Sequence, residues 1–203
     1  MQRHFRGLFD GLEGGDDLLS LRCALVLSGL SAAADDFVVA ALANPRQIHR
    51  LLYYELSPDD CPEAAGNYRG SNHPALKHNV VAYSFNEGEG TTKIAAPHEV
   101  GDLMIKYGAF LRRDALREAA TVEEKLTFIT PIIVIFGMIH PFADGNGHIQ
   151  RMTFQCLLER AGFAMAPTWR VHPCPYGEDV HRAFAALDFR GAACLLRPFL
   201  SPR

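Results

Sequence analysis

The sequence predicts a mainly α-helical protein with one β-hairpin. Apolar residues recur at helical spacing in several segments, most clearly between Val100 and Leu111. Strand-forming residues gather instead in one segment, Val80 to Phe85. With 203 residues and 48% hydrophobic content, the chain suits one ordinary domain with a well-buried core.

The domain is expected to be undivided, because the sequence has no internal repeat, no low-complexity run and no long linker. We therefore expect a single domain over residues 1–203. Its core would span about 60–165, with N-terminal helices over 1–59 and a C-terminal helix and tail over 166–203.

The N-terminal third is expected to be helical. Leu18 to Leu30 is apolar-rich, Asp35 and Asp36 can cap a helix over Phe37–Leu42, and Asn44-Pro45 ends that run. A further helical stripe follows, made by Ile48, Leu51, Leu52 and Leu56.

The hairpin is expected next along the chain. The strand-forming run from Asn79 to Phe85 ends at the turn Asn86–Gly90, and Thr91 to Ile94 would form the second strand. Pro97 suits the first turn of the helix that carries the Val100–Leu111 stripe. Later helices are expected at about Val122–Ile139, at Asn146 to about Arg160, and around Val180, Phe184 and Leu187.

Composition argues against two classes of partner. A net charge of −3, a pI near 6.3 and the lack of a Lys/Arg cluster argue against a protein that coats nucleic acid or an anionic membrane. The apolar stretch Leu126–Ile139 is shorter than the ~20 residues that span a bilayer, and it contains Thr130 and Pro131. We expect a buried helix there, and neither nucleic acid nor membrane as a partner.

The cysteines and the first residues bear on the cellular compartment. Five scattered cysteines, an odd number, fit reduced thiols in cytosol better than a disulfide framework. Residues 1–17 are charged throughout and lack the apolar centre of a secretory signal peptide. We expect a cytoplasmic protein, or one delivered into another cell as an effector by a route that reads other signals.

The segment His140–Arg151, HPFADGNGHIQR, carries the strongest functional signal. Pro141 cannot extend the preceding helix regularly, and the two glycines free the backbone for positive φ, so the next helix begins at this turn. The first amides of a helix lack intrahelical partners and lie at the positive end of its dipole. A phosphate cradle is therefore expected at Gly145, Asn146, Gly147 and His148.

Three side chains would complete this site. Asp144 would repel a phosphate unless a divalent cation lay between them, and one carboxylate with phosphate oxygens and water commonly binds Mg²⁺. Arg151 lies one turn into the helix and can reach back to the outer phosphates. The neutral imidazole of His140 can accept the proton of an incoming hydroxyl. These residues favour phosphoryl or nucleotidyl transfer; the alternative is a Gly-rich helix cap with a buried histidine.

This segment resembles the signature of the Fic family, H-P-F-x-D/E-G-N-G-R-x-x-R, and agrees with it at every specified position except His148. The resemblance covers roughly residues 60 to 165 and includes Gly66–Arg69, which is similar to a G-x-Y-R upstream of family sites. It implies a helical bundle with a hairpin flap. It also implies an enzyme that transfers AMP from Mg-ATP to a hydroxyl of a target protein, or of itself, and releases pyrophosphate.

The resemblance further implies residue roles. His140 would be the general base, Phe142 would anchor the loop in the core, and Asp144 would hold Mg²⁺. Gly145 to Gly147 would form the anion hole, and Arg151 would grip the distal phosphate of ATP.

The hairpin through Thr92, Lys93 and Ile94 resembles the flap that holds the target chain in the family. An exposed strand edge can pair with the main chain of an extended target segment, so a flap is also reasonable physically. The alternative is an ordinary hairpin that covers the core.

His148 stands where family members usually carry arginine, which offers a permanent charge and more donors. Three outcomes are open: a competent enzyme with His148 as a substitute donor, an enzyme that uses a different nucleotide, or a site that binds without turnover. The first is favoured because the base, the metal ligand and the distal arginine are intact. On that interpretation, His148→Arg raises transfer or leaves it unchanged.

The sequence leaves open how the protein is regulated and whether it is an enzyme or a nucleotide-binding module. Many Fic proteins carry an inhibitory S/T-x-x-x-E-G/N helix, yet no Glu in this chain has Ser or Thr four residues before it. We expect inhibition from a separate protein or another device; the alternative is an unrestrained effector. The chain could also be a nucleotide-binding regulatory module with weak or no turnover, or could transfer a different phosphate-containing group.

One other segment has metal-capable side chains. His172-Pro-Cys174-Pro lies near His181, but zinc-site spacing is absent and the prolines stiffen the segment. We expect a loop rather than a metal site there.

Overall fold

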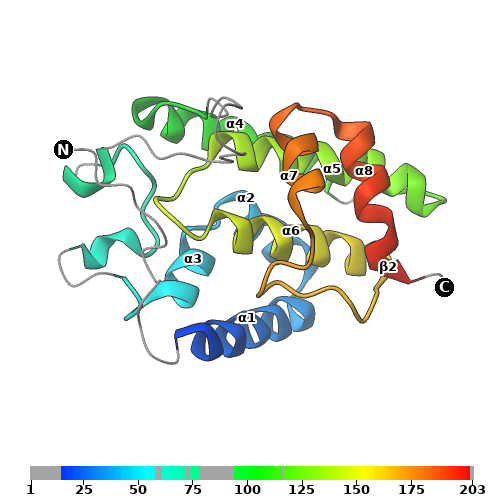
Figure 1. The fold of residues 1–203 in the computed structure, drawn as a ribbon, viewed down its shortest axis with the longest axis horizontal. Helices are drawn as coiled ribbons and strands as arrows, with labels where there is room; N and C mark the ends of the chain where they lie inside the picture. The colour runs from blue at the N-terminus through cyan, green and yellow to red at the C-terminus, as the bar shows by residue number, and fades with distance from the viewer. Residues whose placement is uncertain (1–14, 58–60, 72–73, 78–93, 116, 202–203) are drawn as a thin grey trace.

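The computed structural model describes residues 15–57, 61–71, 74–77, 94–115 and 117–201. Within these residues the chain is mainly helical, as predicted (Figure 1). The α-helices are α1 (Gly15–Ala32), α2 (Asp35–Ala43), α3 (Arg46–Tyr53), α4 (Val100–Asp114), α5 (Val122–Ile139), α6 (Asn146–Arg160), α7 (Glu178–Ala185) and α8 (Phe189–Leu196). Short 3₁₀ turns lie at Pro62–Ala64, Pro74–Lys77, Pro97–Glu99 and Arg197–Phe199.

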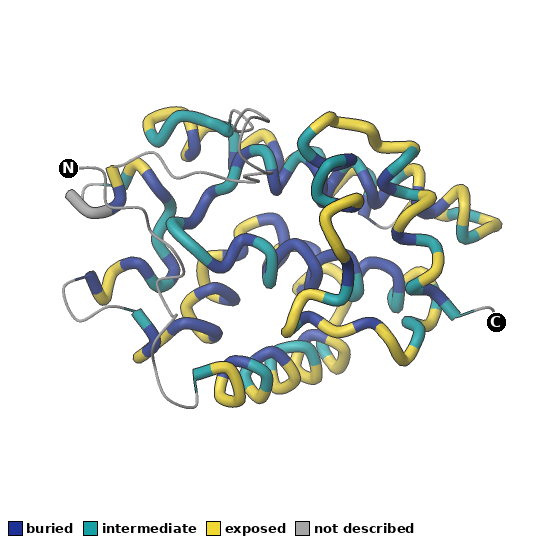
Figure 2. The backbone as a smooth tube through the Cα atoms, viewed as in Figure 1, coloured by how far each residue is buried: buried dark blue, intermediate teal, exposed yellow. Residues whose placement is uncertain are grey.

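Helices α5 and α6 form the centre of the molecule. They pack against each other; α5 also contacts α4 and α8, and α6 also contacts α1 and α2. Figure 2 shows that α6 is buried along most of its length. One apolar core joins residues from Leu19 in α1 to Leu200 near the C-terminus. Both ends of the loop between α5 and α6 are therefore fixed by well-packed helices.

Helix α5 has clear signals at its two ends. The Thr121 hydroxyl caps the N-terminus by accepting the Glu124 amide (3.1 Å). At the other end His140 adopts a left-handed conformation (φ 48°), and Pro141 follows. The buried helix predicted from Leu126 to Ile139 is thus present. Among the described residues, no helix is long and apolar enough to cross a membrane.

The C-terminal region differs from the prediction of a single helix. Leu187, which completed the predicted stripe, has a positive φ (55°) and lies exposed between α7 and α8. The Asp188 carboxylate then caps α8 by accepting the Gly191 amide (2.8 Å). The structure also contains a small sheet that the sequence did not predict, in which β1 (Ala164–Met165) pairs antiparallel with β2 (Leu200–Ser201).

The predicted hairpin lies outside the described residues, except for its last residue. Residues 78–93 are not described, so Thr92 and Lys93 cannot be placed. Ile94 is half-buried and not in a strand. The next residue is fixed to the end of α5, because the Ala95 amide donates to the Met138 carbonyl (3.1 Å).

Candidate active site

The loop from His140 to Gly145 connects α5 to α6 and is held rigidly in the core. The Phe142 ring is fully buried and stacks on the His49 ring, with 3.8 Å between the ring centroids. The buried Asn146 side chain makes two hydrogen bonds to Phe142: it accepts from the backbone amide (2.9 Å) and donates to the carbonyl (2.8 Å). The Phe142 anchor and the Asn146 side chain therefore fix the start of α6 relative to the loop.

Gly145 allows the loop to turn into α6 against the ring of Tyr53. Its φ is +76°, and a Cβ added there would lie 2.3 Å from Cε2 of Tyr53. Only glycine combines this conformation with this close approach. The turn predicted from the glycines is thus present, and α3 supplies the wall behind it.

His49 is a site residue that the sequence did not reveal. Its Nδ1 accepts the Gly66 amide (2.9 Å), so its Nε2–H donates to the Asp144 carbonyl (3.0 Å). Burial lowers the pKa of His49 to about 4. This neutral imidazole joins α3 to two distant loops. In the sequence it stands only as one polar residue on an apolar helix face.

His140 lies at the C-terminal end of α5 and is only partly accessible to solvent. Burial, and next the Arg69 guanidinium, lower the pKa of His140 to about 4, against the opposing effect of a hydrogen bond to the Gly137 backbone. The imidazole is therefore neutral near pH 7 and can accept a proton.

Arg69 fixes the backbone on which His140 stands. Its side chain is 1% exposed, and its Nε donates to the His140 carbonyl (2.7 Å) while its Nη2 donates to the carbonyls of Ile139 and Ala95 (both 3.0 Å). Its own amide donates to the Pro141 carbonyl (2.7 Å). The resemblance singled out Arg69 without a physical reason. The structure supplies one, since these bonds satisfy carbonyls at the end of α5.

Three histidines, of which His49 is buried and His140 and His148 are partly buried, make the stability of the protein depend on pH. Burial is the main cause that lowers the pKa of His49 and His140 to about 4 and that of His148 to about 2. An unfolded histidine titrates near ~6.5. Below that pH the unfolded chain binds protons that the folded protein does not, so the free energy of unfolding is highest above about pH 6.5 and falls as pH falls toward 4.

We expect this loss to be on the order of 1 kcal/mol per pH unit for each histidine. Urea unfolding at pH 7, 6 and 5 measures it. His98→Gln, at an exposed histidine, is the control variant. A free energy of unfolding that is constant from pH 7 to 5 would contradict this prediction.

The N-terminus of α6 offers a smaller cradle than the sequence suggested. The Gly145 amide donates to Oδ1 of Asp144 (2.6 Å), and the His148 amide donates to the Gly145 carbonyl (3.1 Å). The amides of Asn146 and Gly147 are the first two of the helix and lack an intrahelical acceptor. An anion at this end of α6 would therefore meet these two amides.

Asp144 is partly exposed beside that cradle. The described residues contain no group of three or more His, Cys, Asp or Glu side chains that could hold a metal ion. A single carboxylate of this kind fits Mg²⁺, which keeps several waters and takes further oxygens from substrate phosphates. The donor set thus fits Mg²⁺ better than a metal that needs a complete protein cage.

Arg151 points its guanidinium along α6 toward Gly147. Its side chain is buried, and Nε donates to the Val171 carbonyl (2.6 Å). Nη1 lies 2.9 Å from the position that a Cβ on Gly147 would take. The two Nη groups make no hydrogen bond within the described residues, so they remain able to donate to an anion at the start of the helix.

His148 is arranged differently from a phosphate ligand. Its Nδ1 lies 2.7 Å from the Tyr53 hydroxyl, and its Nε2 lies 2.9 Å from Nδ1 of His172. Burial is the main cause that lowers the pKa of His148 to about 2, followed by the positive charge of Arg151. Both ring nitrogens therefore bond within the protein, and the ring is neutral.

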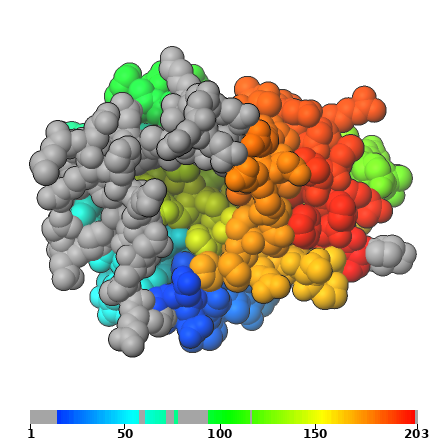
Figure 3. Space-filling view, in the orientation of Figure 1, coloured from blue at the N-terminus to red at the C-terminus, as the bar shows by residue number. Residues whose placement is uncertain are grey.

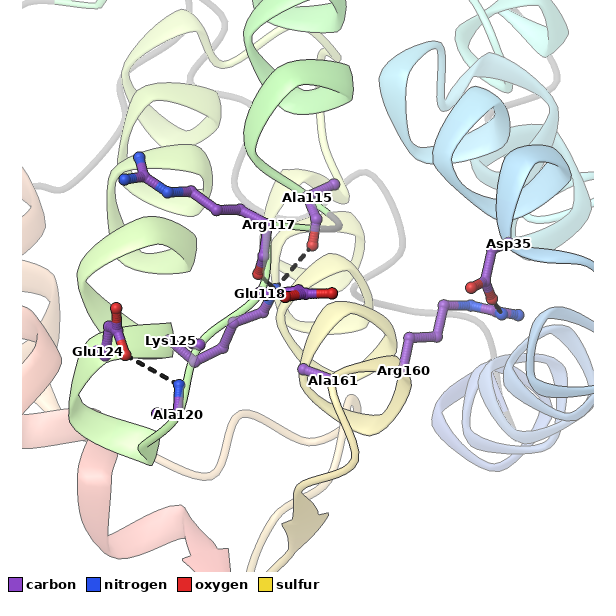
Figure 4. Close-up of a pocket in the computed structure, with 10 residues that line it drawn as sticks. Asp35, Ala115, Arg117, Glu118, Ala120, Glu124, Lys125, Arg160 and Ala161 are labelled. Atoms are coloured by element: carbon purple, nitrogen blue, oxygen red, sulfur yellow. Dashed lines mark hydrogen bonds and ion pairs between the residues drawn. The ribbon is translucent and has the colours of Figure 1, made fainter.

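One cavity lies at the opposite ends of α5 and α6 from this loop (Figure 4). It measures about 580 Å³, and two of the cationic side chains that line it, Lys125 and Arg160, bond within the protein. The buried Lys125 ammonium donates to the carbonyls of Ala115 (3.0 Å) and Arg117 (2.8 Å). Arg160 pairs with Asp35. These contacts hold the end of α4 and join α6 to α2, so the charged side chains at this cavity serve to connect helices.

Comparison with known proteins agrees with the fold and the motif. A family model described as the Fic/DOC family matches residues 42–158. A search of curated proteins finds no match.

Several solved structures resemble this one. The type IV secretion system effector protein BepA is 18% identical over 95% of this chain, with a TM-score of 0.60, and this chain spans 63% of its length. The N-terminal Fic domain of an effector from Bartonella sp. AR 15-3 is 16% identical, with a TM-score of 0.66, over 95% of this chain and 84% of that one.

A third structure, the N-terminal Fic domain of a putative cell filamentation protein from Bartonella quintana with bound ADP, is 17% identical, with a TM-score of 0.58, over 96% of this chain and 90% of that one. At these identities the likeness concerns the fold alone. The family model, however, covers more than half of the sequence and includes the whole motif from His140 to Arg151. The protein therefore belongs to the Fic/DOC family.

Proposed function

We propose that this protein is a protein adenylyltransferase, which moves AMP from Mg-ATP to a hydroxyl side chain of a target protein or of itself. Fic domains are typically transferases that act on proteins. The observation that carries the proposal is the pairing, across one rigid loop, of a neutral imidazole at His140 with an anion cradle at the start of α6. The ADP bound to the Bartonella quintana Fic domain supports the choice of a nucleotide.

In the proposed reaction each group of the site has one role. His140 accepts the proton of the target hydroxyl, whose oxygen attacks the α-phosphorus of ATP. The bond from that phosphorus to the bridging oxygen breaks, and pyrophosphate leaves. The amides of Asn146 and Gly147 and the guanidinium of Arg151 neutralise phosphate charge. Asp144 would hold Mg²⁺, which supplies further charge neutralisation when bound.

The target would be held by the hairpin through Thr92, Lys93 and Ile94, which stays a prediction. The similar Bartonella proteins are effectors. We therefore propose that this protein acts either in the cytoplasm of its own cell or inside a cell into which it is delivered. A separate inhibitory protein remains part of this proposal.

A second candidate is a nucleotide-binding regulatory module with little turnover, or an enzyme that transfers a different phosphate-containing group. The hydrogen bonds of the His148 ring support this second candidate. Because Tyr53 and His172 occupy both ring nitrogens, the site has one phosphate donor fewer than the family pattern provides.

Incubation with Mg²⁺ and α-labelled ATP tests the proposal. We expect label on protein with the wild type, complete loss of label with His140→Ala, and retention with His98→Ala, a matched change at an exposed histidine. Binding of ATP without label would favour the regulatory module. Label on protein from γ-labelled ATP would indicate phosphoryl transfer instead of AMP transfer. Label only from another nucleotide would indicate transfer of a group from that nucleotide.

A further inference from the structure

The segment Trp169–Tyr176 follows the part of the chain that the family model matches, and it runs beside α6 (Figure 1). Three hydrogen bonds fasten it to that helix. His172 bonds to His148, the Val171 carbonyl accepts from Arg151, and the Trp169 indole donates to Oε1 of Gln155 (3.0 Å). The segment therefore contacts α6 directly beside the candidate site.

These contacts are ordered along the helix. Positions 148, 151 and 155 are spaced i, i+3 and i+7, so they share one face of α6. Their partners 172, 171 and 169 run in the opposite direction. Figure 3 shows the segment, in orange, on the surface between the N-terminal residues in blue and the C-terminal residues in red. It is thus a strap laid antiparallel along the face of α6 that carries Arg151.

In the hydrogen bond between the two histidines, His148 is the donor and His172 is the acceptor. Nε2 of His172 faces the Asp16 carboxylate at 3.6 Å, which favours a hydrogen on that nitrogen. Nδ1 of His172 is then an acceptor for Nε2–H of His148, and Nδ1 of His148 accepts from the Tyr53 hydroxyl. Tyr53 is the wall against which Gly145 turns. The pair thus links the strap to the turn at the start of α6.

The strap holds the side chain of Arg151 in place. The strap occupies its Nε through Val171, and the Tyr176 ring lies 6.0 Å from its Cζ. A guanidinium fixed through Nε keeps its two Nη groups in one plane and one direction. That direction is toward Gly147, where the proposed nucleotide phosphates would lie.

We infer that residues 169–176 form a strap that positions Arg151 for the distal phosphates of the nucleotide, and that His148 is a positioning residue that docks the strap through His172. The inference rests on the proposed function only for the identity of the ligand. It explains why a histidine can occupy the position of the usual arginine: its imidazole supports the remaining arginine. His148→Arg removes this docking contact, so it is expected to weaken ATP binding, contrary to the expectation from the family pattern alone.

Nucleotide binding tests the strap in a His140→Ala background, where the proposed turnover is absent. Adding His172→Ala should weaken ATP binding about tenfold and change AMP binding less than about twofold, because AMP lacks the distal phosphates. His172→Asn should restore most of the ATP affinity, since an amide oxygen can accept from Nε2–H of His148. Arg170→Ala, an exposed change in the same strap, is the matched control. Equal weakening of ATP and AMP would overturn the assignment to the distal phosphates.

A second measurement needs no nucleotide. The hydrogen bond to Val171 should protect the Nε–H of Arg151 from exchange with water, which NMR detects and which Arg151→Lys assigns by its disappearance. We expect His172→Ala and His148→Ala to remove this protection and Arg170→Ala to keep it. Unchanged protection in both histidine variants would overturn the strap. Loss of protection in a protein that binds no nucleotide would support the strap and contradict the proposed function.

Discussion

Gly145→Ala is expected to lower the free energy of unfolding by about 2 to 5 kcal/mol. One part is the cost of a left-handed conformation for a residue with a Cβ, since φ is +76°. The other part is steric, because the new Cβ would lie 2.3 Å from the Tyr53 ring. Tyr53 is buried and bonded to His148, so it cannot move aside without breaking that contact. Chemical denaturation of the two proteins measures the difference.

Gly29→Ala is the matched control for this change. Gly29 lies within α1, and an added Cβ there meets nothing within 4 Å. Alanine should therefore stabilise this helix, by up to about 1 kcal/mol. If Gly145→Ala were as stable as the wild type, Gly145 could not adopt a left-handed conformation against the Tyr53 ring.

Arg69→Met is expected to lower the free energy of unfolding by about 3 kcal/mol or more. Methionine keeps much of the buried volume but leaves the carbonyls of Ile139, His140 and Ala95 without their donor. The backbone of His140 also loses its support. Transfer activity should therefore fall even at temperatures where the variant remains folded.

Arg69→Lys should be more stable than Arg69→Met, because an ammonium group can donate to some of these carbonyls. It should be less stable than the wild type, because it reaches fewer of them than the guanidinium group. Arg112→Met, at an exposed position of α4, controls for the loss of a positive charge. Thermal melting and label transfer from ATP would be measured on all three variants. Wild-type stability in Arg69→Met would contradict the role described for this side chain.

Local signals account for most of what the sequence predicted. The helices from α1 to α6 were predicted from apolar-rich or regularly spaced segments and the residues that bound them, and the break between α5 and α6 follows from proline and glycine. The division into α7 and α8 was missed because Leu187 fits a helical stripe by spacing. The Asp188 cap was the signal that could have revealed it.

Contacts distant in sequence could not be predicted. Tyr53 and His148 are 95 positions apart, and His172 lies 24 positions beyond His148. Nothing in the spacing of either residue indicates the other. The side chain of His148 was therefore interpreted by comparison with arginine, as a donor to phosphate, whereas its environment is set by residues outside the motif. The positions of His140 and Gly145 depend on local chain geometry, which is why they were easier to foresee.

The strap has a consequence for how such proteins diversify. Its three anchoring residues lie beyond the last residue that the family model matches, yet one of them sets the orientation of a motif arginine. On the proposed function, replacement of this segment would thus change the affinity for the distal phosphates while the motif sequence stays constant.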